Sequence, residues 1–132
     1  MRRAAAAAAL VALAAACAHP RTGDRAERRE PRPGAGEEVG VASFYGGRFH
    51  GRRTASGARY DQHALTCAHP SAPFGTRLRV TDLESGRSVV VTVNDRGPFA
   101  RGRVVDLSLA AAQVLGMVER GLARVRVERV AE

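Results

Sequence analysis

Two aspartates, eleven positions apart, are the residues of this sequence best placed for acid/base chemistry. Asp95 follows the run 88–93 and Asp106 follows the run 103–105, and both runs are rich in valine, which favours strands. A strand fixes the backbone while the following loop leaves the side chain open, so a carboxylate at a strand end can exchange a proton with a substrate. The alternative is structural, and it stays open here: Asp95 would cap the turn that begins at Arg96, and Asp106 would open the helix that follows it.

The elements that must position these aspartates are short strands. Alternating or continuous apolar runs predict six of them. They cover residues Val39–Phe44, Leu65–Ala68, Arg77–Thr81, Ser88–Val93, Arg103–Leu107 and Leu122–Val130. One helix is predicted over Leu109–Leu115, with Ser108 as its N-cap and Gly116 as its end. Six short strands and one or two small helices predict a mainly β fold, a small closed barrel, because closure removes exposed strand edges.

The N-terminus has the pattern of a targeting segment. A basic start is followed by an apolar run over residues 4–16, which is shorter than the about 20 residues that span a bilayer. We therefore predict a signal peptide over residues 1–16. The run 13–17 resembles a bacterial lipobox with Ala14 in place of the usual leucine, which predicts acylation of Cys17; plain secretory cleavage is the alternative. Because no aspartate follows Cys17, the resemblance to such lipoproteins favours the outer membrane, with the protein facing the periplasm.

The next segment is predicted to be a flexible tether over residues 17–38, because proline, glycine and charged residues there show no apolar periodicity. The folded domain is predicted over residues 39–132. It carries 14 arginines and 8 acidic residues, a charge of +6, which favours anionic partners such as wall polymers and phospholipid head groups. Nucleic acid is not expected, because the aromatic residues that stack on bases are few.

Cysteine and histidine chemistry is a second possibility that the sequence raises. Cys67 lies two residues before His69, so a catalytic cysteine–histidine pair is one interpretation and a buried strand cysteine is the other. His50, His63 and His69 lack the spacing of a zinc site. No metal and no cofactor are therefore expected.

Seven ordered blocks of residues between Gly40 and Val127 resemble rare lipoprotein A, the septal-ring lytic transglycosylase family. That family has a six-stranded double-psi β-barrel, which it shares with expansins. The matching blocks are residues Val41–Gly46, Phe49–Gly51, Thr54–Gly57, Ala64–His69, Pro73–Thr76, Val93–Phe99 and Val105–Ser108.

The resemblance implies cleavage of peptidoglycan glycan strands between N-acetylmuramic acid and N-acetylglucosamine, with a 1,6-anhydro end as product. One carboxyl group can first protonate the leaving oxygen and then take the proton of the attacking C6 hydroxyl. By resemblance, Asp95 and Asp106 are the candidate catalytic acids, and their order is left open. His69 is the third candidate catalytic residue, through a hydrogen bond to substrate or to a carboxylate. The candidate substrate-binding residues are Ser43, Tyr45, Thr66, Asn94 and Arg96.

One position departs from the family pattern. Members that cleave glycan usually have a glutamate directly after the glycine of the Thr54–Gly57 block, and this chain has Ala58. The alternative function is therefore a non-catalytic, expansin-like lipoprotein that binds peptidoglycan. A third class is a structural lipoprotein that acts through cell-division or envelope proteins.

Overall fold

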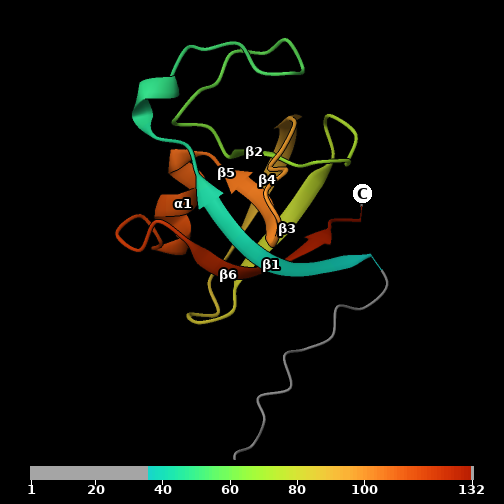
Figure 1. The fold of residues 1–132 in the computed structure, drawn as a ribbon, viewed down its shortest axis with the longest axis vertical. Helices are drawn as coiled ribbons and strands as arrows, with labels where there is room; N and C mark the ends of the chain where they lie inside the picture. The colour runs from blue at the N-terminus through green and yellow to red at the C-terminus, as the bar shows by residue number, and fades with distance from the viewer. Residues whose placement is uncertain (1–35, 132) are drawn as a thin grey trace, which may run out of the picture. The chain divides into compact units, whose positions relative to one another are not determined.

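The computed structural model describes residues 36–131, and these form one barrel with a single α-helix (Figure 1). The strands are β1 (Glu37–Phe44), β2 (Thr66–Ala68), β3 (Arg77–Asp82), β4 (Ser88–Asp95), β5 (Arg103–Leu107) and β6 (Ala123–Arg129). They close in the order β1-β5-β2-β4-β3-β6. The pairs β1–β5 and β2–β4 are parallel, and the other four pairs are antiparallel. The predicted six-stranded barrel is confirmed.

Strand boundaries differ from the prediction by one or two residues in every strand except β5, and the two larger differences concern β1 and β4. β1 begins at Glu37, two residues earlier than predicted, because Glu37 and Glu38 pair with Glu128 and Val127 of β6. The predicted tether therefore ends inside the first strand. β4 continues to Asp95, so the aspartate is the last residue of the strand itself.

The predicted helix has the predicted limits. α1 spans Leu109–Leu115; the Ser108 hydroxyl accepts a hydrogen bond from the backbone N–H of Ala111, and Gly116 ends the helix in the left-handed region at φ 69°. Ala112 and Leu115 are buried against the barrel. Ser108, and not Asp106, is therefore the N-cap of α1, so the structural alternative for Asp106 does not apply.

The barrel is filled by valines that alternate along the strands. In β6, Val125 and Val127 are buried while Arg124 is exposed, as the period of a half-solvated strand requires. The buried valines Val80, Val91, Val93 and Val105 complete the centre of the core. Apolar burial of this kind is the main source of stability in a small domain.

A long segment, residues 45–65, joins β1 to β2 and lies across the end of the barrel at which β1 and β5 finish (Figure 1). It contains one turn of 3-10 helix, Gly47–Phe49. No helix within residues 36–131 is long and apolar enough to cross a membrane. The predicted signal peptide, Cys17 and most of the predicted tether lie outside the described residues.

A buried carboxylate, Asp82, fixes the turn between β3 and β4. Its side chain accepts hydrogen bonds from the backbone N–H groups of Glu84 and Ser85 and pairs with Arg120, which also contacts Glu84 at 2.8 Å. Burial by itself would raise the pKa of Asp82, but the hydrogen bonds from Arg120 and the two backbone N–H groups outweigh it, so the pKa lies below its usual value.

Replacing Asp82 with alanine is expected to lower the free energy of unfolding at neutral pH by about 2 kcal/mol, because two backbone N–H groups lose their acceptor. Since the pKa of Asp82 is lower in the folded state, its contribution is present above about pH 4 and is lost as the pH falls through the folded-state value. Urea unfolding of both proteins between about pH 7 and about pH 2 tests this. A gap between the two proteins that stays constant with pH would contradict it.

Candidate functional site

The two candidate aspartates lie in one row across the barrel. Ala68 of β2 pairs with Asp106 of β5 on one side and with Asp95 of β4 on the other, and Asp106 also pairs with Ser43 of β1. Neighbouring strands are about 4.8 Å apart, so the two aspartate Cα atoms are separated by roughly 10 Å. The strands therefore bring together two carboxylates that the sequence places eleven positions apart.

A one-residue register shift puts Asp95 on the same face as Asp106. Val89, Val91 and Val93 of β4 face the core, so simple alternation would turn position 95 inward as well. Cys67 pairs with Val93, however, and the next residue of β2 pairs with Asp95, which leaves Asn94 as the extra residue of a bulge. The bulge turns the carboxylate of Asp95 outward.

A second shift, in β5, serves Asp106. Val41 pairs with Arg103, but the next residue of β1 pairs with Val105, so Val104 is the extra residue. Arg103 and Asp106 consequently share the outer face although they are three positions apart on a strand. Gly40 makes room for this arrangement, because a Cβ there would lie 2.5 Å from a methyl carbon of Val104 and 2.9 Å from the carbonyl oxygen of Gly102.

Asp95 is held by hydrogen bonds at both oxygens. Its Oδ1 accepts from the backbone N–H groups of Ala55 and Arg96, each at 2.9 Å. Its Oδ2 accepts from the hydroxyl of Tyr45 at 3.0 Å. The contact with Arg96 confirms that Asp95 caps the turn after β4. The same side chain therefore stabilises this turn and remains a candidate acid/base group.

Asp106 has a different environment. Its Oδ1 accepts hydrogen bonds from the Ser43 hydroxyl and from the guanidinium of Arg103, which also donates to Ser43. Its Oδ2 accepts no hydrogen bond from residues 36–131. Asp106 is thus an arginine-paired carboxylate with one oxygen left for a ligand.

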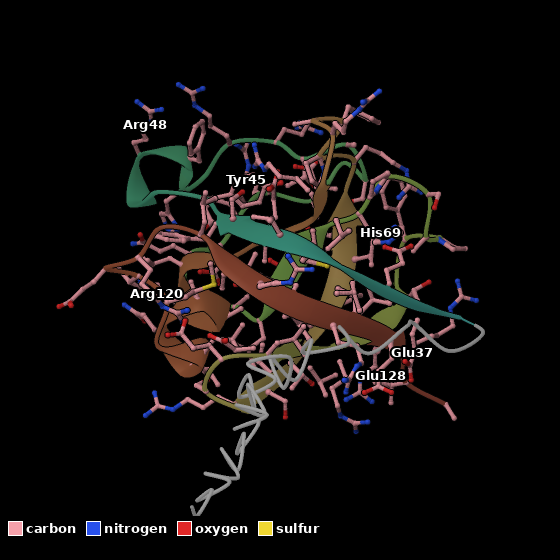
Figure 2. The ribbon with its side chains drawn as sticks, turned by 60° about the horizontal axis from the view of Figure 1, so that its bottom comes forward. Glu37, Tyr45, Arg48, His69, Arg120 and Glu128 are labelled. Atoms are coloured by element: carbon pink, nitrogen blue, oxygen red, sulfur yellow. The ribbon has the colours of Figure 1, made fainter. Side chains whose placement is uncertain are left out.

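Tyr45 links the two aspartates electrostatically. Burial and the charge of Asp95, reinforced by the hydrogen bond to Asp95 and by the charge of Asp106, raise the pKa of the phenol far above its ordinary value. Tyr45 therefore stays protonated and remains a hydrogen-bond donor to Asp95. Figure 2 shows Tyr45 just beyond the end of β1.

Asp95 opens into a cavity of about 230 Å³ with an aromatic wall. The ring of Tyr45 contacts Tyr60 and Phe49 edge-on, with centroids 5.1 Å and 6.1 Å apart. The cavity is lined by Tyr45, Phe49, Arg52, Arg53, Thr54, Tyr60 and Asp95. Rings of this kind pack against the apolar face of a sugar, and the carboxylate beside them supplies the polar group that a binding site needs.

His69 contacts neither aspartate through its ring. The ring Nδ1 accepts hydrogen bonds from the backbone N–H groups of Ser71 and Ala72, at 3.1 and 2.9 Å, and Nε2 lies 3.1 Å from the carboxylate of Glu38. Two donors at Nδ1 require the proton to sit on Nε2, which then donates to Glu38. This ring lies beside the first half of β1, away from Tyr45 (Figure 2), and lines a separate cavity of about 480 Å³ with Glu38. The hydrogen bond to a carboxylate was expected; the catalytic role stays a prediction.

Three candidate substrate-binding residues make no side-chain contact with either aspartate. The guanidinium of Arg96 donates to the carbonyl oxygens of His69 and Ala72, at 3.2 and 2.6 Å, and lies over the ring of Phe74. The Thr66 hydroxyl is buried and has no hydrogen-bond partner among residues 36–131. The backbone carbonyl oxygen of Asn94 accepts a hydrogen bond from the backbone N–H of Ser56. Arg96 is thus committed to holding the loop after β2, while Ser43 and Tyr45 contact the two aspartates directly.

The Thr54–Gly57 block, together with Ala58, forms a turn against β4. Thr54 donates both its N–H and its hydroxyl to the carbonyl oxygen of Ala58, and the same turn supplies the N–H of Ala55 to Asp95. These contacts use the backbone of Ala58 and not its side chain. Asp95 therefore keeps its position without a glutamate at position 58.

Cys67 is fully buried in the core, and burial followed by the charge of Asp106 raises its pKa to about 12. Its thiol is therefore protonated at neutral pH, which favours the interpretation as a buried strand cysteine over a catalytic one. Within residues 36–131, no three side chains of His, Cys, Asp or Glu are grouped so that they could hold a metal ion.

Several residues around the aspartates and His69 were not predicted as site residues: Arg103, Gly40 and Glu38, and the cavity-lining residues Phe49, Arg52, Arg53, Thr54 and Tyr60. Arg103 and Gly40 act through the bulge in β5, and Glu38 was assigned to the tether. The sequence has Arg103 three positions before Asp106, but simple alternation along a strand would place these two side chains on opposite faces, so their ion pair could not be predicted.

The comparisons with known proteins agree with this geometry. A family model described as "Lytic transglycolase" matches residues 37–127. The "Probable endolytic peptidoglycan transglycosylase RlpA" of Nostoc sp. is 62% identical over 91 residues, which are 67% of this chain and 24% of that protein. The "Endolytic peptidoglycan transglycosylase RlpA" of Neisseria meningitidis serogroup B is 53% identical over 93 residues, 70% of this chain and 39% of that protein. The matched part therefore spans well under half the length of these relatives.

Two solved structures have the same fold. The Streptomyces papain inhibitor aligns with a TM-score of 0.58 and 24% identity over 72% of this chain and 94% of its own. A mutant Clavibacter michiganensis expansin in complex with cellohexaose aligns with a TM-score of 0.58 and 24% identity over 72% of this chain and 50% of its own. At this identity the likeness concerns the fold alone, the double-psi β-barrel. The family model and the relatives show that this chain belongs to the RlpA family of lytic transglycolase barrels.

Proposed function

We propose that this protein is an endolytic peptidoglycan transglycosylase, which cleaves glycan strands between N-acetylmuramic acid and N-acetylglucosamine and leaves 1,6-anhydro ends. One observation carries the proposal: Asp95 opens into an aromatic-walled cavity, on the same face as a second carboxylate. Membership of the RlpA family supports it.

In the reaction, Asp95 begins protonated and gives its proton to O4 of N-acetylglucosamine as the bond from C1 to O4 breaks. The C6 hydroxyl oxygen of N-acetylmuramic acid then forms a bond to C1, and its proton goes to the carboxylate of Asp95. No water is consumed, and Asp95 ends in its starting form. Tyr45, which stays protonated, donates its hydrogen bond to the carboxylate form of Asp95 between the two transfers.

Asp106 supplies a fixed negative charge in this mechanism. Arg103 and Ser43 hold its Oδ1, and its Oδ2 faces no protein donor within residues 36–131. As the bond at C1 breaks, positive charge develops on the sugar ring, and a preorganised carboxylate stabilises it. His69 acts at a distance in this scheme, by holding the loop that follows Ala68.

The test is mass spectrometry of the soluble fraction after the full chain is incubated with purified sacculi and with peptide-free glycan strands. Anhydro-terminated fragments are the expected products. Retention of the protein on sacculi without any such fragment would instead support the non-catalytic glycan-binding alternative, which Ala58 favours. If the protein is not retained on sacculi and releases no products, the result would support a structural lipoprotein that acts through protein partners.

Restoring a carboxylate at position 58 separates the two main candidates further. Ala58→Glu is expected to raise the rate of product formation by about tenfold, because it adds an acid/base group to the turn that holds Asp95. Ala58→Gln, of the same size without the charge, is the matched control and should leave the rate unchanged. Equal rates in all three proteins would mean that position 58 takes no part in the reaction.

We further propose that the protein resides in the bacterial envelope, lipid-anchored through Cys17 and facing the periplasm from the outer membrane. The pattern of residues 1–17 supports this location. Labelled palmitate should enter the wild-type protein and not Cys17→Ser; equal labelling of both would exclude the anchor.

A further inference from the structure

Two arginines beside Asp95 have no acidic partner. Arg52 and Arg53 are both exposed and both line the 230 Å³ cavity, and the guanidinium of Arg52 lies over the ring of Phe49, 5.4 Å from its centroid. Within residues 36–131, no carboxylate forms an ion pair or a hydrogen bond with either guanidinium. Two positive charges at the cavity are therefore available to a ligand.

The neighbouring arginines differ in this respect. The guanidinium of Arg59 donates to the carbonyl oxygen of Gly51 at 2.9 Å, and that of Arg96 donates to two carbonyl oxygens of the loop after β2. Asp95 itself does not pair with either guanidinium; its oxygens accept hydrogen bonds from Tyr45 and from two backbone N–H groups. The cavity thus combines a carboxylate that neutral donors hold in place with two guanidinium groups that pair with no acid within residues 36–131.

The chemistry of the glycan supplies a matching anion. Muramic acid carries a lactyl ether on C3, two ring carbons from the C1 atom at which the bond breaks. If Asp95 protonates the oxygen on C1, the lactyl group of the same sugar lies next to the cavity. In strands without stem peptides this group ends in a free carboxylate, and in peptide-bearing strands it ends in an amide with carboxylates further along the stem.

We propose that Arg52 and Arg53 form a carboxylate subsite, which recognises the acidic group carried by the muramic acid residue at the cleavage point; this assignment rests on the proposed function of the barrel. Guanidinium groups bind carboxylates through paired, charge-assisted hydrogen bonds, and the Phe49 ring beneath Arg52 supports one of the two groups. Through this subsite, the cavity determines whether the protein binds peptide-free or peptide-bearing strands more tightly.

The experiment measures the dissociation constant of the full chain for three fluorescently labelled probes at an ionic strength of about 0.15 M, which screens distant charges. The probes are peptide-free strands, the same strands with their lactyl carboxyls converted to amides, and peptide-bearing strands. The variants are Arg52→Gln, Arg53→Gln and the pair together. Arg79→Gln is the matched control, because Arg79 is exposed on β3 and lines none of the cavity.

We expect the wild-type protein to bind peptide-free strands about tenfold more tightly than amidated strands, the usual effect of a hydrogen-bonded charge. The double variant should lose this difference and Arg79→Gln should keep it. If peptide-bearing strands also bind tightly and lose affinity in the double variant, the carboxylate that the subsite takes is that of the stem peptide.

Equal binding of free, amidated and peptide-bearing strands by the wild-type protein would overturn the subsite. So would an equal loss in Arg79→Gln, because net charge alone would then explain the binding. Since these measurements need no bond cleavage, a protein that discriminates the probes but releases no anhydro products retains the subsite and loses only the proposed activity.

Discussion

Asp95→Asn is expected to lower the rate of anhydro-product formation by about 10²- to 10⁴-fold, the range that general acid/base groups contribute. Asparagine has the size of aspartate, and its oxygen can still accept from the N–H groups of Ala55 and Arg96. It cannot give up or take a proton in the reaction. Binding of glycan strands should therefore change little while product formation falls, and mass spectrometry with a parallel binding measurement detects the difference.

The control is Asp61→Asn, because Asp61 belongs to the same long segment but lines no part of the Asp95 cavity. It should cut glycan at the wild-type rate. Asp106→Asn provides the comparison between the two candidate acids, since it removes the charge and keeps the shape. An active Asp95→Asn together with an inactive Asp106→Asn would assign proton transfer to Asp106.

Gly40→Ala is expected to destabilise the barrel by roughly 1–3 kcal/mol, the usual cost of overpacking. The added methyl would lie 2.5 Å from a methyl carbon of Val104 and 2.9 Å from the backbone oxygen of Gly102, and the backbone contact cannot be relieved by rotating a side chain. Because the bulge at Val104 places Arg103 beside Asp106, the same change should also weaken glycan cleavage. Urea unfolding and a product assay measure the two effects.

Gly46→Ala is the matched control, near the end of the same strand. Gly46 has φ −74° and no atom within 4 Å of an added Cβ, so the free energy of unfolding should change by less than about 0.5 kcal/mol. Gly40→Ala combined with Val104→Ala should recover part of the loss, because one of the two contacts is removed. Equal stability of Gly40→Ala and the wild-type protein would show that the bulge can shift without cost.

The sequence was sufficient for elements whose signals are local. The limits of α1 followed from Ser108 and Gly116, and the hairpin of β3 and β4 followed from two valine-rich runs around a turn. The two aspartates and a small closed barrel also followed from the strand pattern, and the family resemblance added the double-psi topology and the catalytic role of the aspartates.

Local signals did not predict the register with which neighbouring strands pair, or where a bulge interrupts it. Simple alternation in β4 would turn Asp95 inward. Only the pairing with β2 shows that Asn94 is a bulged residue without a partner in β2. The contact between Glu38 and His69 joins positions 31 apart, and Glu38 follows a segment whose composition predicts no strand. Such features depend on which strands become neighbours, and this is decided by the closed barrel as a whole.

The two bulges have a consequence for insertions and deletions in this gene. Losing the codon for Asn94 would put Asp95 directly after the inward-facing Val93, so simple alternation would still turn the carboxylate away from the valine core. Losing the codon for Val104 would likewise leave Arg103 and Asp106 two positions apart on a regular strand, on the same face. Each shortened chain would keep the residues that the chemistry uses on the outer face, so a one-codon deletion should be tolerated better at these two bulges than at a core-facing position such as Val91, where it would shift the register and turn neighbouring side chains to the wrong face.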